Sequence, residues 1–200
     1  MFAVANKLYG LHFALTDEVE KYHQEVQTYK VTDAEGNYVA LLYTDFFPRA
    51  GKRNGAWMTT FKDQYIDLQG NDSRPHISIV CNFTRPTDTE PSLLTFNELT
   101  TLFHEFGHAL HGMLSRVTYP SLSGTNVARD FVELPSQLME NWCYEEETLR
   151  LFATHYQTGE PLPMEWVHRI KKAQKFMEGL LTVRQLVFGT LDMHVSCARY

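Results

Sequence analysis

The 200-residue sequence predicts a mainly α-helical chain with a small antiparallel β portion, that is, an α+β fold. Two observations predict this class. Segments rich in β-branched and aromatic residues are confined to the first half of the chain, and beyond residue 130 the segments have a helical pattern. Because no internal repeat, low-complexity tract or linker occurs, we expect a single domain over residues 1–200.

The first half begins with apolar residues whose spacing is compatible with a short helix within residues 1–15, although Gly10 interrupts it. Residues 26–31 and 38–47 are predicted as the strands of a β-hairpin, because residues 33–37 between them have the composition of a turn. This half therefore contributes most of the expected β structure.

Two further extended segments are expected before the helical half. Residues 57–61 are predicted as a short strand, and residues 76–83 form the clearest strand, because Ile77 and Ile79 alternate with Ser78. That strand either offers its edge to an extended peptide or lies in the core, and the sequence leaves both interpretations open.

The second half begins with a helix predicted from Thr95 or Asn97 to Leu114, since Thr95 and Glu98 provide a cap and an early carboxylate. A loop follows over residues 117–130. Helices are then predicted at residues 131–144, with Pro135 in the first turn, at 145–156 and, after a break at 159–163, at 164–195 as one long helix.

Composition narrows the functional classes. The formal net charge is −6 with scattered basic residues, which argues against nucleic acid as the main partner. No run of roughly eighteen apolar residues predicts a membrane span, and the N-terminal residues lack a signal-peptide pattern. Cys81, Cys143 and Cys197 are far apart and odd in number, so we expect three buried thiols and a reducing, cytoplasmic location.

The most informative stretch is His104-Glu105-Phe106-Gly107-His108 in the predicted helix. At about 100° per residue, the two histidines lie one turn apart on one face, with Glu105 beside them. Two imidazoles at this spacing can bind one zinc ion, and the carboxylate between them can accept a proton from water. Glu133 is the best candidate for a third ligand, and a fourth position left open for water is typical of catalytic zinc. These residues predict one Zn²⁺ per chain and peptide hydrolysis, with Glu105 as the general base.

The surroundings of this motif carry a specific resemblance. Residues 104–112, 123–126 and 129–137 resemble the zinc oligopeptidase family of thimet oligopeptidase, oligopeptidase A and dipeptidyl carboxypeptidase. The similarity extends over nearly the whole chain, because three shorter segments also match: Gly55-Ala56-Trp57-Met58, Cys81-Asn82-Phe83 and Glu140-Asn141-Trp142.

The resemblance implies a zincin-like metallopeptidase catalytic domain, in an enzyme whose deep channel admits short peptide substrates and excludes folded proteins. It also implies that His104, His108 and Glu133 are the zinc ligands and that Glu105 is the general base. Members of the family have an N-terminal helical half and a C-terminal segment with histidine and tyrosine. Neither occurs in this sequence, so we expect a partial catalytic domain.

Several residues have two open interpretations. His111 is expected to pack beside the site, in preference to serving as a fourth ligand. Asp130 and Glu98 either orient a ligand imidazole or are solvated or capping residues. Residues 123–126 form either a substrate loop or an ordinary turn.

Two other functions are compatible with parts of the sequence. The chain could bind zinc or peptide without turnover, if the partners of the oxyanion are missing. A di-iron carboxylate protein uses pairs of E-x-x-H elements, and the chain has three of them, at Glu20-His23, Glu105-His108 and Glu165-His168. The β-rich first half disfavours the four long helices that such a protein needs.

Overall fold

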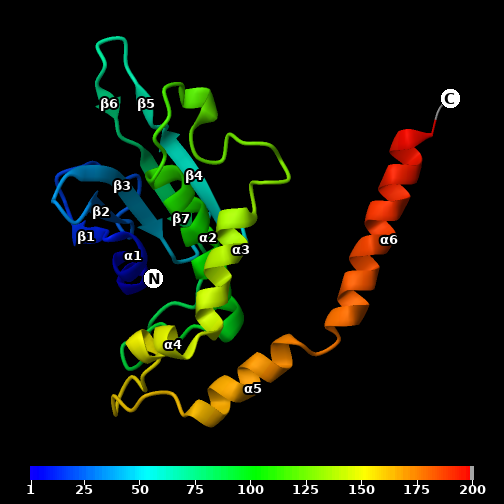
Figure 1. Ribbon diagram of the computed structural model, residues 1–200. Coiled ribbons are helices and arrows are strands. Elements are labelled where there is room, and N and C mark those ends of the chain that lie inside the picture. Colours follow the sequence, from blue (N-terminus) through cyan, green and yellow to red (C-terminus); the bar gives the residue numbers. More distant parts are fainter. Residues whose placement is uncertain (199–200) are drawn as a thin grey trace. The chain divides into compact units, whose positions relative to one another are not determined.

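The computed structural model describes residues 1–198 (Figure 1). The chain divides into two compact units, Met1–Phe152 and the residues from Ala153 onward. The first unit contains a sheet and the helix that carries the His104-Glu105 motif, and the second is helical.

A five-stranded sheet forms the centre of the first unit, with strand order β1-β2-β3-β7-β4. The bounds are β1 (His12–Leu15), β2 (Gln27–Thr32), β3 (Tyr38–Asp45), β4 (Trp57–Lys62) and β7 (His76–Val80). The predicted hairpin of β2 and β3 is confirmed. The expectation of an antiparallel β portion is wrong for one pair, because β7 lies parallel to β3. Along the chain, the edge strand β4 comes first and is followed by the small two-stranded ribbon of β5 (Tyr65–Ile66) and β6 (Asp72–Ser73). The next strand, β7, lies between β3 and β4 in the sheet.

This insertion decides which strand has a free edge. β7 pairs with β3 on one side and with β4 on the other, so the interpretation of β7 as an edge strand is wrong and the core interpretation is confirmed. Both Ile77 and Ile79 are fully buried. The edge strand on this side of the sheet is β4.

The N-terminal helix is shorter than predicted. α1 (Phe2–Tyr9) ends at Gly10, whose φ of 68° is a left-handed conformation that glycine adopts without strain. The following residues form β1, which pairs with β2 and was not predicted.

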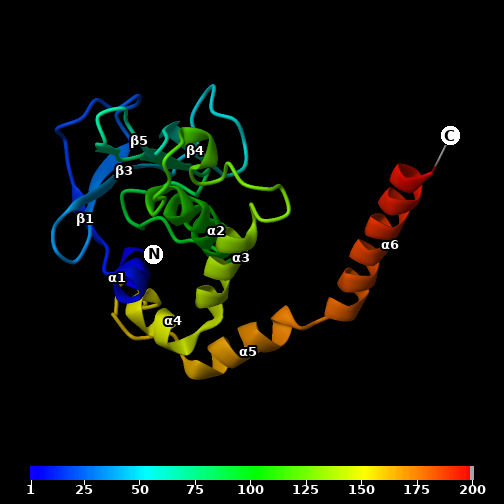
Figure 2. The same ribbon diagram turned by 45° about the horizontal axis from the view of Figure 1, so that its top comes forward.

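The core lies between one face of the sheet and the long helix α2 (Phe96–Met113). Phe103 and Phe106 on this helix pack with Ile77 and Ile79. The predicted N-terminus is confirmed: the Thr95 hydroxyl accepts a hydrogen bond from the backbone of Glu98, and the Glu98 carboxylate accepts one from the backbone of Thr95. Figure 2 shows α2 beneath the sheet with the shorter helix α3 (Leu134–Glu140) beside it.

The later helices differ from the prediction in their bounds. α3 begins at Leu134, with Pro135 in its first turn as predicted, and continues as the 3₁₀ helix η2 (Asn141–Tyr144). α4 spans Glu146–Phe152, and a short 3₁₀ turn, η1 (Pro120–Leu122), lies in the predicted loop.

In the second unit the single long helix predicted for residues 164–195 is wrong. The structure has α5 (Met164–Gln174) and α6 (Glu178–Cys197). Met177 between them has a φ of 58°, which interrupts the helix at a position without proline or glycine.

The cysteine prediction is partly confirmed. Cys81 and Cys143 are fully buried free thiols, whereas Cys197 near the end of α6 is exposed, so the expectation of burial is wrong for that residue.

Candidate metal centre

Helix α2 brings the three residues of the motif together on one side. His104 and His108 are one turn apart, and their rings are nearly perpendicular, with centroids separated by 4.9 Å. The neighbouring Phe103 and Phe106 fill the core, which fixes the rotation of the helix about its axis. The histidines therefore face away from the sheet core and toward the segment that contains Glu133.

Glu133 immediately precedes α3, and its carboxylate lies between the two imidazoles. Oε2 of Glu133 is 3.2 Å from Nε2 of His104 and 3.2 Å from Nε2 of His108. Two atoms that bind one zinc ion in tetrahedral geometry are about 3.3 Å apart. The distances from Oε2 of Glu133 to the two Nε2 atoms are therefore compatible with ligands of one zinc ion.

Among residues 1–198, this is the group of three histidine and acidic side chains whose ligand atoms converge, all within 4.8 Å of one another. His111 does not join it. Glu20 and His23 lie outside helices, so the helical bundle of a di-iron protein has no counterpart in the described part of the chain.

Gly107 explains why α3 can approach α2 so closely (Figure 1). A Cβ atom at this position would lie 2.5 Å from the carbonyl oxygen of Pro135 and 2.6 Å from Cα of Ser136. Both are backbone atoms that cannot move aside easily. A glycine here lets the backbone of α3 rest on α2, and this contact brings Glu133 to the histidines.

Two side chains that the sequence did not reveal orient the potential ligands. The hydroxyl of Ser136 donates to Oε2 of Glu133, over 2.9 Å. Oε1 of Glu140 lies 2.6 Å from Nδ1 of His104. The orienting carboxylate is therefore Glu140, while Glu98 caps α2 and Asp130 does not contact either histidine. Glu140 comes seven residues, about two helical turns, after Glu133, and this spacing was the available signal.

The burial of Glu105 and His108 changes their titration. Burial raises the pKa of Glu105; His104 and a backbone hydrogen bond from Met58 oppose this, and Glu133 adds to it. Only 7% of the Glu105 surface is exposed. Burial lowers the pKa of His108 despite the nearby Glu133, which favours the neutral imidazole that binds metals.

His111 and the turn at residues 123–126 lie beside this site. The ring of His111 packs 6.1 Å from that of Phe131 and lines a cavity of about 370 Å³. Its pKa is lowered by burial. The turn is anchored by hydrogen bonds: the backbone of Gln64 donates to Ser123, and the backbone of Gly124 donates to Ser115. These contacts favour a fixed turn.

The fold and these distances define a class of protein in which two histidines of one helix and one glutamate face a single position and could hold a metal ion. The sequence model of Peptidase family M3 matches residues 1–198, and the chain belongs to this family.

Several curated relatives cover nearly the whole chain. It is 40% identical to oligopeptidase A of Salmonella typhimurium over 98% of its length, which is 29% of that protein. It is also 40% identical to dipeptidyl carboxypeptidase of Escherichia coli, over 98% of the chain and 28% of the relative. The thimet-like oligopeptidase of Dictyostelium discoideum is 36% identical over 96% of the chain and 29% of the relative. The chain thus spans less than a third of these relatives. Within residues 1–198, no helix is both long and apolar enough to cross a membrane.

Proposed function

We propose that this chain carries the catalytic zinc site of a zincin-like metallopeptidase that hydrolyses peptide bonds in short oligopeptides. His104, His108 and Glu133 would bind one Zn²⁺, and Glu105 would act as the general base. One observation carries the proposal: the Nε2 atoms of both histidines lie 3.2 Å from one carboxylate oxygen of Glu133. Membership of peptidase family M3 supports it. We also propose that residues 1–200 are part of a larger catalytic domain.

When bound, zinc would supply Lewis acidity, which lowers the pKa of water and polarises the carbonyl group of the scissile bond. Glu105 is adjacent to His104 on α2 and is held by the backbone of Met58. Its carboxylate accepts a proton as water adds to the carbonyl carbon, and it returns this proton to the amine as the C–N bond breaks. Burial, which makes Glu105 a better proton acceptor, suits this role.

The peptide would lie along β4. This strand is at the edge of the sheet, so one row of its backbone N–H and C=O groups has no partner strand. An extended peptide that adds there gains main-chain hydrogen bonds regardless of its sequence. The Met58 contact with Glu105 shows that this strand borders the motif.

The decisive experiment is Glu105→Gln. The amide keeps the shape of the side chain but cannot accept the proton, so hydrolysis of a fluorogenic peptide should fall by at least the roughly 10²–10⁴-fold typical of general bases. Zinc content, measured by elemental mass spectrometry, should remain about one per chain. The matched control is Glu147→Gln, because Glu147 is exposed and pairs with Lys7.

Undiminished turnover in Glu105→Gln would contradict the assignment of the base. A wild-type protein that holds zinc but cleaves no peptide would favour the alternative of zinc or peptide binding without turnover.

A further inference from the structure

The face of β4 that points away from α2 lines a groove that the proposed mechanism does not use. In the pairing of β4 with β7, Trp57 lies opposite Val80 and Thr59 opposite Ser78. These residues share the face opposite to that of Met58, because successive strand residues point to opposite faces. The groove has a volume of about 610 Å³, and its wall continues to Phe61 and to a basic loop, residues 46–56, which joins β3 to β4.

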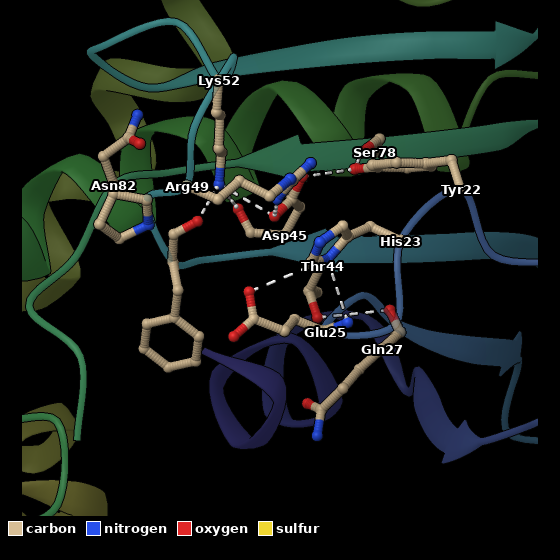
Figure 3. Close-up of polar contacts among 12 residues, drawn as sticks. Tyr22, His23, Glu25, Gln27, Thr44, Asp45, Arg49, Lys52, Ser78 and Asn82 are labelled. Carbon is tan, nitrogen blue, oxygen red and sulfur yellow. Dashed lines mark hydrogen bonds and ion pairs between the residues drawn. The ribbon is translucent and has the colours of Figure 1, made fainter. Parts of the chain in front are cut away.

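Two of the three cations in this loop are already paired (Figure 3). Arg49 donates two hydrogen bonds to the carboxylate of Asp45, over 2.7 and 2.9 Å, and Nζ of Lys52 donates to the same carboxylate over 2.9 Å. The hydroxyl of Tyr22 adds a fourth bond, over 2.9 Å. Asp45 is 2% exposed, so this carboxylate is saturated and cannot serve another cation.

Arg53 is the third cation, and its situation differs. Its guanidinium carbon lies 4.6 Å from the centre of the Trp57 ring, in cation–π geometry. Among the described residues no carboxylate forms an ion pair with it, and the residue is exposed at the groove. Three cations and one carboxylate leave an excess of positive charge there.

The backbone beneath Arg53 is held in place. The amide of Asn82 donates to the carbonyl oxygens of Arg53 and Gly55, over 2.9 and 2.7 Å. Lys52 additionally donates to the carbonyl oxygen of Phe47, over 2.8 Å. Because Arg53 is stacked on Trp57 and its loop is held by these hydrogen bonds, its guanidinium is preorganised for binding a ligand.

The direction of a peptide on β4 determines which part of it meets Arg53. An antiparallel peptide runs opposite to β4, so its C-terminal part passes Trp57 while the scissile bond lies near Met58 and Glu105. A parallel peptide would bring its positively charged amino end toward Arg53, which the positive groove disfavours. Directly opposed residues of paired strands point to the same face, so the peptide residue opposite Trp57 faces the groove.

We propose that Arg53, stacked on Trp57, binds a carboxylate of the peptide on the C-terminal side of the scissile bond and thereby selects the substrate. The inference rests on the proposed function. The carboxylate belongs either to an acidic side chain or to the C-terminus of the peptide. The first source gives a preference for Asp or Glu after the cleaved bond, and the second directs cleavage to bonds near the C-terminus.

The test compares Arg53→Gln with wild type on three peptides that differ only at the C-terminus or at one residue. One peptide has a free C-terminal carboxylate, one has a C-terminal amide, and one has the amide together with Glu for Gln after the scissile bond. Arg53→Gln removes a charge-assisted hydrogen bond to one carboxylate. It should therefore raise KM roughly tenfold to a hundredfold for the acid-bearing peptide, either the one with the free C-terminus or the one with Glu, whose carboxylate Arg53 binds. KM for the neutral peptide and kcat should change little.

The matched control is Arg169→Gln. Arg169 also lies over a tryptophan, 5.3 Å from the ring of Trp166, but it has a carboxylate partner in Glu165. It should not change the selectivity. A purely structural role of Arg53 would raise KM for all three peptides equally, and that result would overturn the inference, as would a preference for acid that persists in Arg53→Gln.

Calorimetry in the Glu105→Gln background measures binding of the same peptides without turnover. The Kd for the acid-bearing peptide should rise in the Arg53→Gln, Glu105→Gln double variant by the same factor as KM. Because this measurement does not need hydrolysis, a protein that binds peptides selectively but does not cleave them would contradict the proposed function alone. Binding that ignores the carboxylate would contradict the role of Arg53 alone.

Discussion

Nδ1 of His104 lies 2.6 Å from Oε1 of Glu140, and Nε2 of the same ring faces Glu133. A carboxylate on one ring nitrogen keeps the proton there and leaves the other nitrogen bare for a metal. The partner histidine differs, because the buried Nδ1 of His108 has no hydrogen-bond partner among the described residues. The two imidazoles therefore differ at Nδ1: that of His104 faces a carboxylate, whereas that of His108 is buried without a partner among the described residues.

Glu140→Ala should weaken zinc binding by roughly tenfold to a hundredfold, because the ring of His104 would lose its orientation. Glu140→Gln should weaken it less, since the amide oxygen can still accept from Nδ1. Competition with a chromophoric chelator measures the affinity. Glu147→Ala serves as the control at an exposed position, and an unchanged affinity in Glu140→Ala would show that the contact is incidental.

Gly107→Ala should destabilise the fold, although alanine normally favours a helix. The added Cβ would meet the backbone of Pro135 and Ser136 at 2.5–2.6 Å, and overpacking of this kind costs roughly 1–3 kcal/mol or more. Urea unfolding and zinc content should both report the change, because α3 positions Glu133. Gly189→Ala in α6, where no atom lies within 4 Å of the added Cβ, should be neutral or stabilising by up to about 1 kcal/mol. Equal stability of the two variants would contradict this account of the helix contact.

Asp45 should contribute a pH-dependent part of the stability. Burial alone would raise its pKa, but the hydrogen bonds from Arg49, Lys52 and Tyr22 outweigh this and lower the pKa to about 2, from an ordinary value of 3.8. Because the folded pKa lies below the unfolded one, the stabilisation is complete above pH 3.8 and is lost as the pH falls toward 2. It amounts to about 2 kcal/mol.

Asp45→Asn removes this contribution and leaves Lys52 buried without its carboxylate, at a cost of roughly 3–5 kcal/mol at neutral pH. Urea unfolding at several pH values should show a shallower loss of stability below pH 4 than in wild type. Asp17→Asn is the surface control: the side chain of Asp17 is 81% exposed and pairs with Lys21, so its effect should stay below about 1 kcal/mol. Identical acid profiles for wild type and Asp45→Asn would refute the assignment.

The three cysteines should react at very different rates. Burial raises the pKa of the thiols of Cys81 and Cys143 to about 12, so almost no thiolate is present at neutral pH. Cys197 is exposed. Brief iodoacetamide treatment of the folded protein, followed by peptide mass mapping, should label Cys197 alone, and Cys197→Ser should remove that label. Rapid alkylation of Cys81 would show that the core around this thiol opens readily to solvent.

Much of the candidate site was predictable because it depends on local geometry. The spacing of His104 and His108 places them on one face of any α-helix. The cap at the start of α2 is also a local pattern, because it involves only Thr95 and the nearby Glu98. Glu133 was predicted from the segment of residues 129–137 that contains it. Glu140 and Ser136 were not predicted as orienting groups, because their roles depend on how α3 docks at Gly107, which no local pattern specifies.

The fold was predictable in its elements but less so in its pairing. The strand pattern around Ile77 and Ile79 identifies β7, yet its parallel alignment with β3 results from contacts between segments far apart in the chain. β1 was missed because four residues after a helix carry too little periodicity. The end of α5 was missed because neither proline nor glycine marks the left-handed turn at Met177.

Glu133 reaches the histidines only while α3 rests on Gly107, so a bound ion would fasten two segments that are joined by a long loop. Detachment of α3 would remove one of the three proposed ligands and release the ion. The rate at which zinc leaves the protein, followed with an excess of chelator, would then report how often this region opens. The rate of zinc release would in this way measure the rate of local unfolding around α3.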